Sequence, residues 1–188
     1  MSTTTTNRLE SRYAGINLTG ETHALSAWFV VTLRFMMGGM MLFAGLGKLT
    51  FFREDPFNAT GYLVYGVDSA SPVSGIYADI AANAVLLDII NVLIPSTQIL
   101  IGLALIVGGF VRLAAFGGAL QMLAFYLGGW EGEWLGFFDN TLVYMVLFLA
   151  IGAFAAGRFL GVDRYIEQIN VGGQPLIERY PAIRYLLG

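Results

Sequence analysis

Four long apolar runs alternate with polar segments along the chain. The first run, Trp28–Phe52, is longer than the roughly 20 residues that an α-helix needs to cross the hydrocarbon core of a bilayer. The second and third runs follow each other with only a short glycine-containing turn between them, as in a helical hairpin. This pattern predicts an all-α integral membrane protein, a four-transmembrane-helix bundle with spans at about 28–52, 93–110, 111–130 and 140–159.

The segment between the first and second spans, 53–92, is long for a plain connection in a compact bundle, so it is expected to contain structure. Residues 76–95 have a helical composition, but they include Asp79 and Asp88. A carboxylate at bilayer depth costs roughly 2.5–3.5 kcal/mol on insertion scales. We therefore expect an interfacial or re-entrant helix here instead of a fifth span, and Pro95 is expected to end or kink it.

The two ends of the chain are polar. Residues 1–27 lack the short apolar core of a signal peptide and are predicted as a soluble tail, and 160–188 are predicted as a second, surface-lying tail after the membrane domain 28–159. Lys and Arg are most numerous on the cytoplasmic side of membrane proteins. With both tails inside, the inner side holds Arg8, Arg12, Arg112, Arg158, Arg164, Arg179 and Arg184, against Lys48 and Arg53 outside. The sequence thus predicts a multi-pass protein of the cell membrane with both termini cytoplasmic.

The composition supports a membrane location. Hydrophobic residues make up 56% of the chain and charged residues 12%, whereas soluble proteins have about 25% charged residues. The mean hydropathy is +0.68. A net charge of −3 with scattered arginines provides no basic surface for nucleic acid, so no nucleic-acid partner is expected. Because the chain has no Cys and one His, neither a metal site nor a haem site is expected.

Polar side chains near the outer ends of the spans are the first group of candidate site residues. Ionisable groups inside a membrane need a partner, water or a ligand. A cation beside amides and a tyrosine suits an anionic substrate or a quinone carbonyl, and small polar clusters of this kind line apolar pockets. The candidates for substrate or quinone binding are Lys48, Arg53, Gln98, Asn140 and Tyr144. Gln121 is also polar and lies within a span, but no role is assigned to it.

A second group of charged residues lies towards the inner side: Arg34, Arg112, Arg158 and Asp163. Arg34 has two open interpretations, a bond to a lipid phosphate or a bond to a carboxylate of the C-terminal tail. Asp163 is expected to accept hydrogen bonds from Arg158 or Arg112 and so to lock the cytoplasmic end of the fourth span.

Three segments together resemble the DoxX/DoxD family. They are LRFMMGGMMLFAGLGKLTFF at 33–52, TQILIGLALIVGGFVRLAA at 97–115 and AFAAGRFLGVD at 153–163. The resemblance implies a four-helix membrane bundle and, in the DoxD branch, the large membrane subunit of a thiosulfate:quinone oxidoreductase that works with a small second subunit. It marks Arg34, Lys48, Arg158 and Asp163 as motif positions. Many relatives have Glu where this chain has Gln98, an amide that can bind a quinone oxygen but cannot take up a proton.

Two functions remain open from the sequence. The chain is either a membrane subunit that passes electrons from thiosulfate or another small sulfur donor to a membrane quinone, or a non-catalytic membrane anchor or assembly partner for a soluble redox enzyme. A small-molecule carrier has less support, because the chain shows no internal repeat. Assembly into a homo-oligomer is left open.

Overall fold

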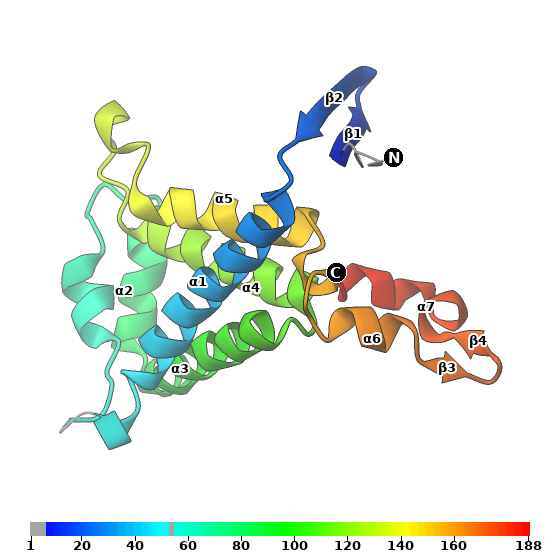
Figure 1. Ribbon diagram of the computed structural model, residues 1–188. Coiled ribbons are helices and arrows are strands. Elements are labelled where there is room, and N and C mark those ends of the chain that lie inside the picture. Colours follow the sequence, from blue (N-terminus) through cyan, green and yellow to red (C-terminus); the bar gives the residue numbers. More distant parts are fainter. Residues whose placement is uncertain (1–6, 53–54) are drawn as a thin grey trace.

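Four long helices lie side by side in the computed structural model, which describes residues 7–52 and 55–188 (Figure 1). They are α1 (Ser26–Leu46), α3 (Ala84–Val107), α4 (Val111–Gly128) and α5 (Asn140–Ala153). Successive helices run in opposite directions, and α1 packs mainly on α3 while α4 packs on α5. The start of α1, the α3–α4 turn and the end of α5 therefore lie at one end of the bundle, called the tail end below. The segment between α1 and α3 and the α4–α5 connection lie at the opposite end.

Three of these helices are long and apolar enough to cross a membrane: α1 has 21 residues, α3 has 24 and α4 has 18. The fourth, α5, has 14 residues. At 1.5 Å per residue α5 is about 21 Å long, less than a hydrocarbon core of about 30 Å. The α-helix therefore ends before the predicted limit of the fourth span at residue 159. A short 3₁₀ turn, η4 (Ala156–Arg158), follows it.

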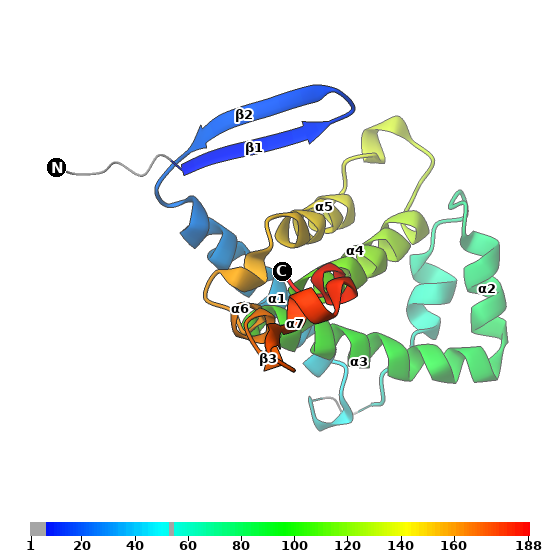
Figure 2. The same ribbon diagram turned by 90° about the vertical axis from the view of Figure 1, so that its right-hand side faces the viewer.

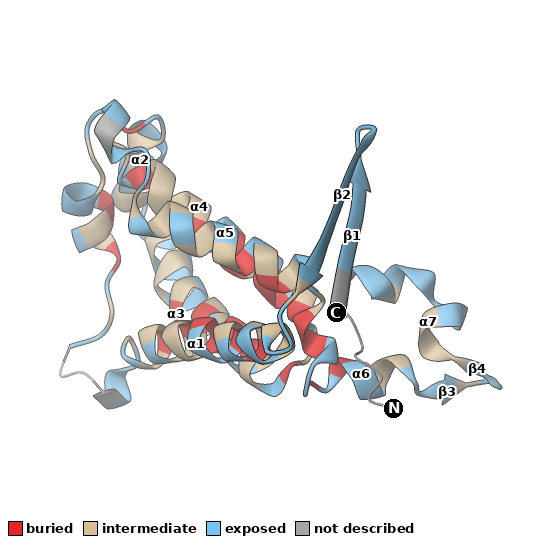
Figure 3. Ribbon diagram, turned by 45° about the horizontal axis from the view of Figure 1, so that its top comes forward, coloured by how far each residue is buried: buried red, intermediate tan, exposed pale blue. Residues whose placement is uncertain are grey.

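The outer surface of the helix bundle is rich in large apolar side chains. More than half of the surface of Phe29, Met36, Phe43, Val92, Leu100, Phe116, Leu120 and Val146 is exposed. Buried positions follow the lines along which the helices touch (Figure 3). An exposed apolar surface on this scale is unusual in soluble monomers and is compatible with contact with a lipid bilayer.

Close backbone contact holds the helix pairs together. A Cβ added at Gly102 of α3 would lie 2.5 Å from the backbone nitrogen of Leu42 in α1. A Cβ at Gly118 of α4 would lie 2.7 Å from the ring of Phe148 in α5. Small residues at such positions allow tight packing, which replaces the hydrophobic effect as the force that associates helices in lipid.

The segment expected to form one interfacial helix up to Pro95 is divided differently. It contains α2 (Ser74–Ala82), and α3 begins at Ala84 and continues through Pro95. The division lies at Asn83, whose side-chain oxygen accepts hydrogen bonds from the backbone N–H groups of Val85 and Leu86. Asparagine is a strong N-cap residue, and its capping bonds favour a helix start. Of the two expected effects of Pro95, the end of a helix is wrong, because α3 continues through this buried residue and helices of membrane proteins tolerate proline. A kink at Pro95 stays a prediction.

Both tails contain short elements that the all-α prediction omits. Strands β1 (Asn7–Tyr13) and β2 (Ile16–Thr22) form an antiparallel hairpin. Its two turn residues both have positive φ, as two-residue hairpin turns favour. The C-terminal tail contains α6 (Asp163–Glu167), a small hairpin of β3 (Asn170–Val171) and β4 (Gln174–Pro175), α7 (Leu176–Arg179) and the 3₁₀ helix η5 (Pro181–Tyr185). The tail then returns to the bundle, where Leu187 is fully buried.

Candidate functional site

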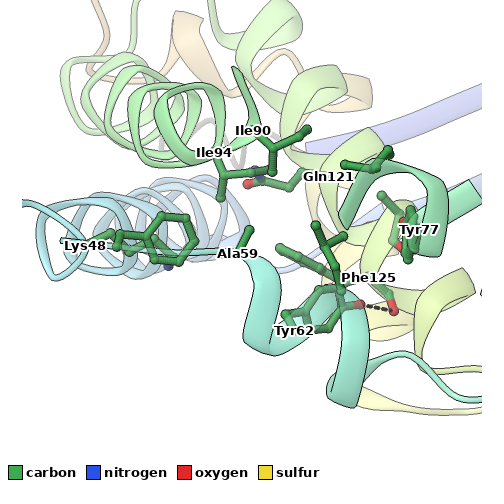
Figure 4. Close-up of a pocket in the computed structure, with 12 residues that line it drawn as sticks. Lys48, Ala59, Tyr62, Tyr77, Ile90, Ile94, Gln121 and Phe125 are labelled. Atoms are coloured by element: carbon green, nitrogen blue, oxygen red, sulfur yellow. Dashed lines mark hydrogen bonds between the residues drawn. The ribbon is translucent and has the colours of Figure 1, made fainter. Parts of the chain in front are cut away.

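A cavity of about 370 Å³ lies at the end of the bundle opposite the tails. Its volume falls within the range of about 300–1,000 Å³ that is typical of small-molecule sites. The walls come from Lys48 in the turn after α1, from the rest of the segment between α1 and α3, and from α3 and α4 (Figure 4). They are mostly apolar, and their residues are Lys48, Phe57, Ala59, Tyr62, Leu63, Tyr77, Ile80, Ile90, Ile94, Gln121, Ala124 and Phe125.

Three hydrogen bonds hold the α1–α3 segment against the long helices and so form one wall. Asn91 Oδ1 in α3 accepts a bond of 2.7 Å from the backbone N–H of Ala59. The Tyr77 hydroxyl in α2 donates to the carbonyl of Ala124 in α4 over 2.8 Å. The Tyr62 hydroxyl, in the π-helical turn η2 (Tyr62–Gly66), donates to a second α4 carbonyl, that of Phe125, over 3.4 Å.

The two tyrosines of this wall are held as neutral donors. Burial raises the pKa of Tyr62 to about 12, and the neighbouring Tyr77 adds to the shift. Burial also raises the pKa of Tyr77. Both phenols therefore keep their protons at neutral pH, so these two side chains add no charge to the cavity.

Lys48 provides a cationic group in the cavity wall. Its Nζ donates to the carbonyl of Ala44 over 2.9 Å and to Oε1 of Gln98 over 3.0 Å. It also lies 5.6 Å from the centre of the Phe57 ring, within the range of a cation–π contact. The structure thus brings together Lys48 and Gln98, two of the predicted site residues. Gln98 lies buried in α3, and its bond positions the ammonium group just after the end of α1.

Arg34 lies far from this cavity, at the tail end of the bundle, and is fully buried. Its guanidinium donates to the backbone carbonyls of Ala156, Phe159 and Leu160 over 2.6, 2.8 and 3.2 Å. Attraction to the carboxylate of Asp163 adds to these bonds. Arg34 therefore binds the loop that follows α5. Of the two interpretations of this residue, the one with a carboxylate of the C-terminal tail agrees with the nearby Asp163, although the described hydrogen bonds of the guanidinium go to backbone carbonyls.

Asp163 is the second fully buried charged residue of the tail end. Its Oδ1 accepts a bond of 2.6 Å from the backbone N–H of Phe110, and its Oδ2 accepts bonds of 3.0 Å each from Val111 and Gly188. A carboxylate at the start of α4 also matches the positive end of the helix dipole. The expectation that Asp163 accepts bonds from Arg158 or Arg112 is therefore wrong. Backbone donors take that place because they lie nearer in the folded chain.

The substitution Asp163→Asn is expected to lower the stability of the folded protein by about 2–3 kcal/mol, because an amide has one acceptor oxygen and its NH₂ group would face a backbone donor. The measurement is the thermal unfolding midpoint of the purified protein in detergent. The exposed Asp79→Asn is the matched control and should change stability by less than about 0.5 kcal/mol. Equal unfolding midpoints for the two variants would contradict this role of Asp163.

The remaining predicted site residues lie elsewhere. Arg158 forms an exposed ion pair of 2.9 Å with Glu167, and Arg112 donates to the carbonyl of Arg184 over 2.6 Å. Asn140 is exposed at the start of α5, and Tyr144 packs beside the core of the bundle; neither is part of the cavity wall described above. Arg53 lies outside the described residues.

Sequence reasoning missed several residues of the wall. Tyr62 and Tyr77 lie in the α1–α3 segment, which was expected to contain structure, but no residue pattern linked them to α4. Gln121 was noted as polar without a role. Among the residues that the structure describes, no group of three or more His, Asp or Glu side chains is placed to hold a metal ion.

Comparisons with known proteins give no match: no protein-family model, no curated protein and no solved structure is significantly similar to this chain.

Proposed function

We propose that this chain is the membrane subunit of a quinone-linked oxidoreductase of the DoxX/DoxD type and that a quinone binds in the cavity beside Lys48. The observation that carries the proposal is a largely apolar cavity with Lys48 in its wall, whose ammonium group is held by the buried amide of Gln98 behind it. A quinone ring with a prenyl chain has the matching chemistry, because its ring and chain are apolar and its carbonyl oxygens accept hydrogen bonds.

In this proposal the bundle has four spans in the cell membrane. The short α5 and the η4 turn after it form the fourth span. The aromatic residues that precede α5, Trp134, Phe137 and Phe138, suit a membrane interface. Both termini are cytoplasmic, because Arg112 and Arg158 lie at the tail end of the bundle. The cavity is then near the outer surface.

The reaction proposed for the complex is electron transfer from a small sulfur donor such as thiosulfate. Two thiosulfate ions that join through a new S–S bond release two electrons, and a quinone that accepts them with two protons from water becomes the quinol. The role of this chain is to bind the quinone in a dry cavity and to place positive charge from Lys48 near an oxygen that gains electron density. A small second subunit would bind the donor, since this chain has no cysteine for thiol chemistry.

The substitution Ile94→Trp tests whether quinone binds in this cavity. Ile94 belongs to the cavity wall, and Figure 4 shows its side chain beside that of Gln121, so an indole there would fill part of the cavity. We expect the affinity for decylubiquinone to fall at least about tenfold, which corresponds to about 1.4 kcal/mol. The measurement is quinone retained by the full chain in nanodiscs, with empty nanodiscs as the baseline.

The control is Val92→Trp in the same helix, because Val92 is 68% exposed on the apolar outer surface. Quinone retention should stay within about twofold of the original protein in this control. Unchanged retention in Ile94→Trp would place the quinone outside the cavity.

A non-catalytic anchor for a soluble redox enzyme is the second candidate function. The observation that favours it is the β1–β2 hairpin, which stands clear of the long helices beside the end of α5 (Figure 2) and exposes most of its side chains. An anchor requires no quinone. If the original protein retains quinone and Ile94→Trp does not, the result would therefore support the oxidoreductase subunit over the anchor.

A further inference from the structure

Gln121 carries a buried acceptor that no residue described by the structure uses. The residue is 9% exposed, it belongs to the cavity wall, and its Oε1 accepts no hydrogen bond from the described residues. Buried polar atoms in folded proteins nearly always have a partner, so an unpaired one beside a cavity indicates a ligand that supplies the missing group.

The orientation of the Gln121 amide follows from its neighbour Thr97. The Thr97 hydroxyl donates its single hydrogen to the carbonyl of Leu93 over 2.7 Å or to that of Ile94 over 3.1 Å. Its oxygen can then only accept from Gln121, whose Nε2 lies 3.5 Å away. The NH₂ group therefore faces Thr97, and the Oε1 atom is the one left for the cavity.

The two tyrosine hydroxyls of the wall are directed to protein acceptors. The hydroxyls of Tyr77 and Tyr62 bind the α4 carbonyls of Ala124 and Phe125. A ligand that fits the cavity completely thus needs a donor of its own opposite Gln121. An oxidised quinone has carbonyl oxygens and offers no O–H, whereas the quinol has two hydroxyl groups.

We propose that the cavity prefers the quinol to the quinone because a quinol hydroxyl donates to Oε1 of Gln121. This inference rests on the proposed function and adds the redox form that the site selects. Tighter binding of the reduced form raises the reduction potential of the bound couple, and a tenfold preference raises it by about 30 mV for two electrons. A bound quinone is then a stronger electron acceptor than a free one in the membrane.

The experiment compares three probes on the full chain in nanodiscs under anaerobic conditions: decylubiquinol, decylubiquinone and the dimethyl ether of decylubiquinol. The ether has the reduced ring but no O–H donor. In the original protein we expect decylubiquinol to bind at least about tenfold more tightly than either of the others, because only the quinol satisfies Gln121. Similar affinities for quinol and ether would overturn the inference.

The substitution Gln121→Met tests whether this residue causes the preference for quinol, because methionine has a similar length and a far weaker acceptor. We expect the preference for quinol to fall to within about threefold. Leu120→Met, one position away and 57% exposed, is the matched control and should keep the preference. A preference that persists in Gln121→Met would overturn the assignment. If Gln121→Met does not fold, the comparison of the three probes on the original protein still tests whether the cavity prefers the quinol.

This test separates the two proposals. Retention of both quinone and quinol with equal affinity would overturn the preference and leave the quinone site intact. Retention of none of the probes above the level of empty nanodiscs would overturn the proposed function and the inference together.

Discussion

Replacement of Arg34 by leucine is expected to leave little folded protein in the membrane. The guanidinium donates to three backbone carbonyls in the loop after α5, at Ala156, Phe159 and Leu160, of which that of Ala156 also accepts from the N–H of Phe159. Leucine would leave these carbonyls without that donor, and an unsatisfied buried group costs about 1–3 kcal/mol. It would also leave the buried Asp163 without its nearby positive charge, and breaking a buried charged network costs about 3–5 kcal/mol. Total stabilities of only about 5–15 kcal/mol make such a loss severe.

The measurement is the amount of detergent-soluble monodisperse protein and its thermal unfolding midpoint. Arg158→Leu is the matched control, since Arg158 is 44% exposed in its ion pair with Glu167. An exposed pair contributes about 0–1 kcal/mol, so this control should behave like the original protein. Arg34→Lys should be intermediate, because lysine keeps the charge without the planar fork of donors. Equal yield and stability of Arg34→Leu and Arg158→Leu would contradict the structural role of Arg34.

The substitution Lys48→Met is expected to abolish donor-dependent quinone reduction in the proposed complex. Methionine keeps an unbranched apolar side chain in the wall but removes the positive charge. Loss of one donor that stabilises developing negative charge typically lowers the turnover number by about 10²–10³. The measurement is the initial rate of quinone reduction by the reconstituted complex with thiosulfate as donor. An unchanged rate would remove Lys48 from the proposed site.

A structural effect of Lys48→Met can be separated from a functional one. The substitution leaves Oε1 of Gln98 without the bond from Nζ inside the protein, which costs stability. The double variant Lys48→Met, Gln98→Leu removes both partners, and such paired replacements can be nearly neutral for stability. We expect the double variant to regain the thermal unfolding midpoint of the original protein while quinone reduction stays lost.

The motif positions suggested by the resemblance to the DoxX/DoxD family divide into two places in the fold. Arg34 and Asp163 are fully buried at the tail end, where they bind backbone groups of segments far apart in the sequence. Lys48 lies in the cavity wall at the opposite end. Arg158 is exposed. The arrangement favours a structural role for the tail-end pair and a binding role for Lys48, and the substitutions above test each role separately.

Much of the helical architecture could be predicted from the sequence, because hydropathy is a local property that accumulates along a run of residues. It identified the apolar segments that became α1, α3, α4 and α5, and it predicted that the long segment before α3 contains structure. The helix boundaries were less predictable. Capping by Asn83 divides the segment predicted as one helix, and α3 continues through Pro95.

The sequence by itself determined that this chain has long apolar helices, compatible with a lipid bilayer, and a small set of polar groups that need partners. The tertiary structure alone decided which partners they have. Asp163 binds the N–H groups of Phe110 and Val111, and Gln121 of α4 and Lys48 of the turn after α1 belong to one cavity although they lie far apart in the sequence. The physical reason is that these contacts depend on how α1, α3, α4 and the connecting segment pack in three dimensions, which no local pattern of residues encodes.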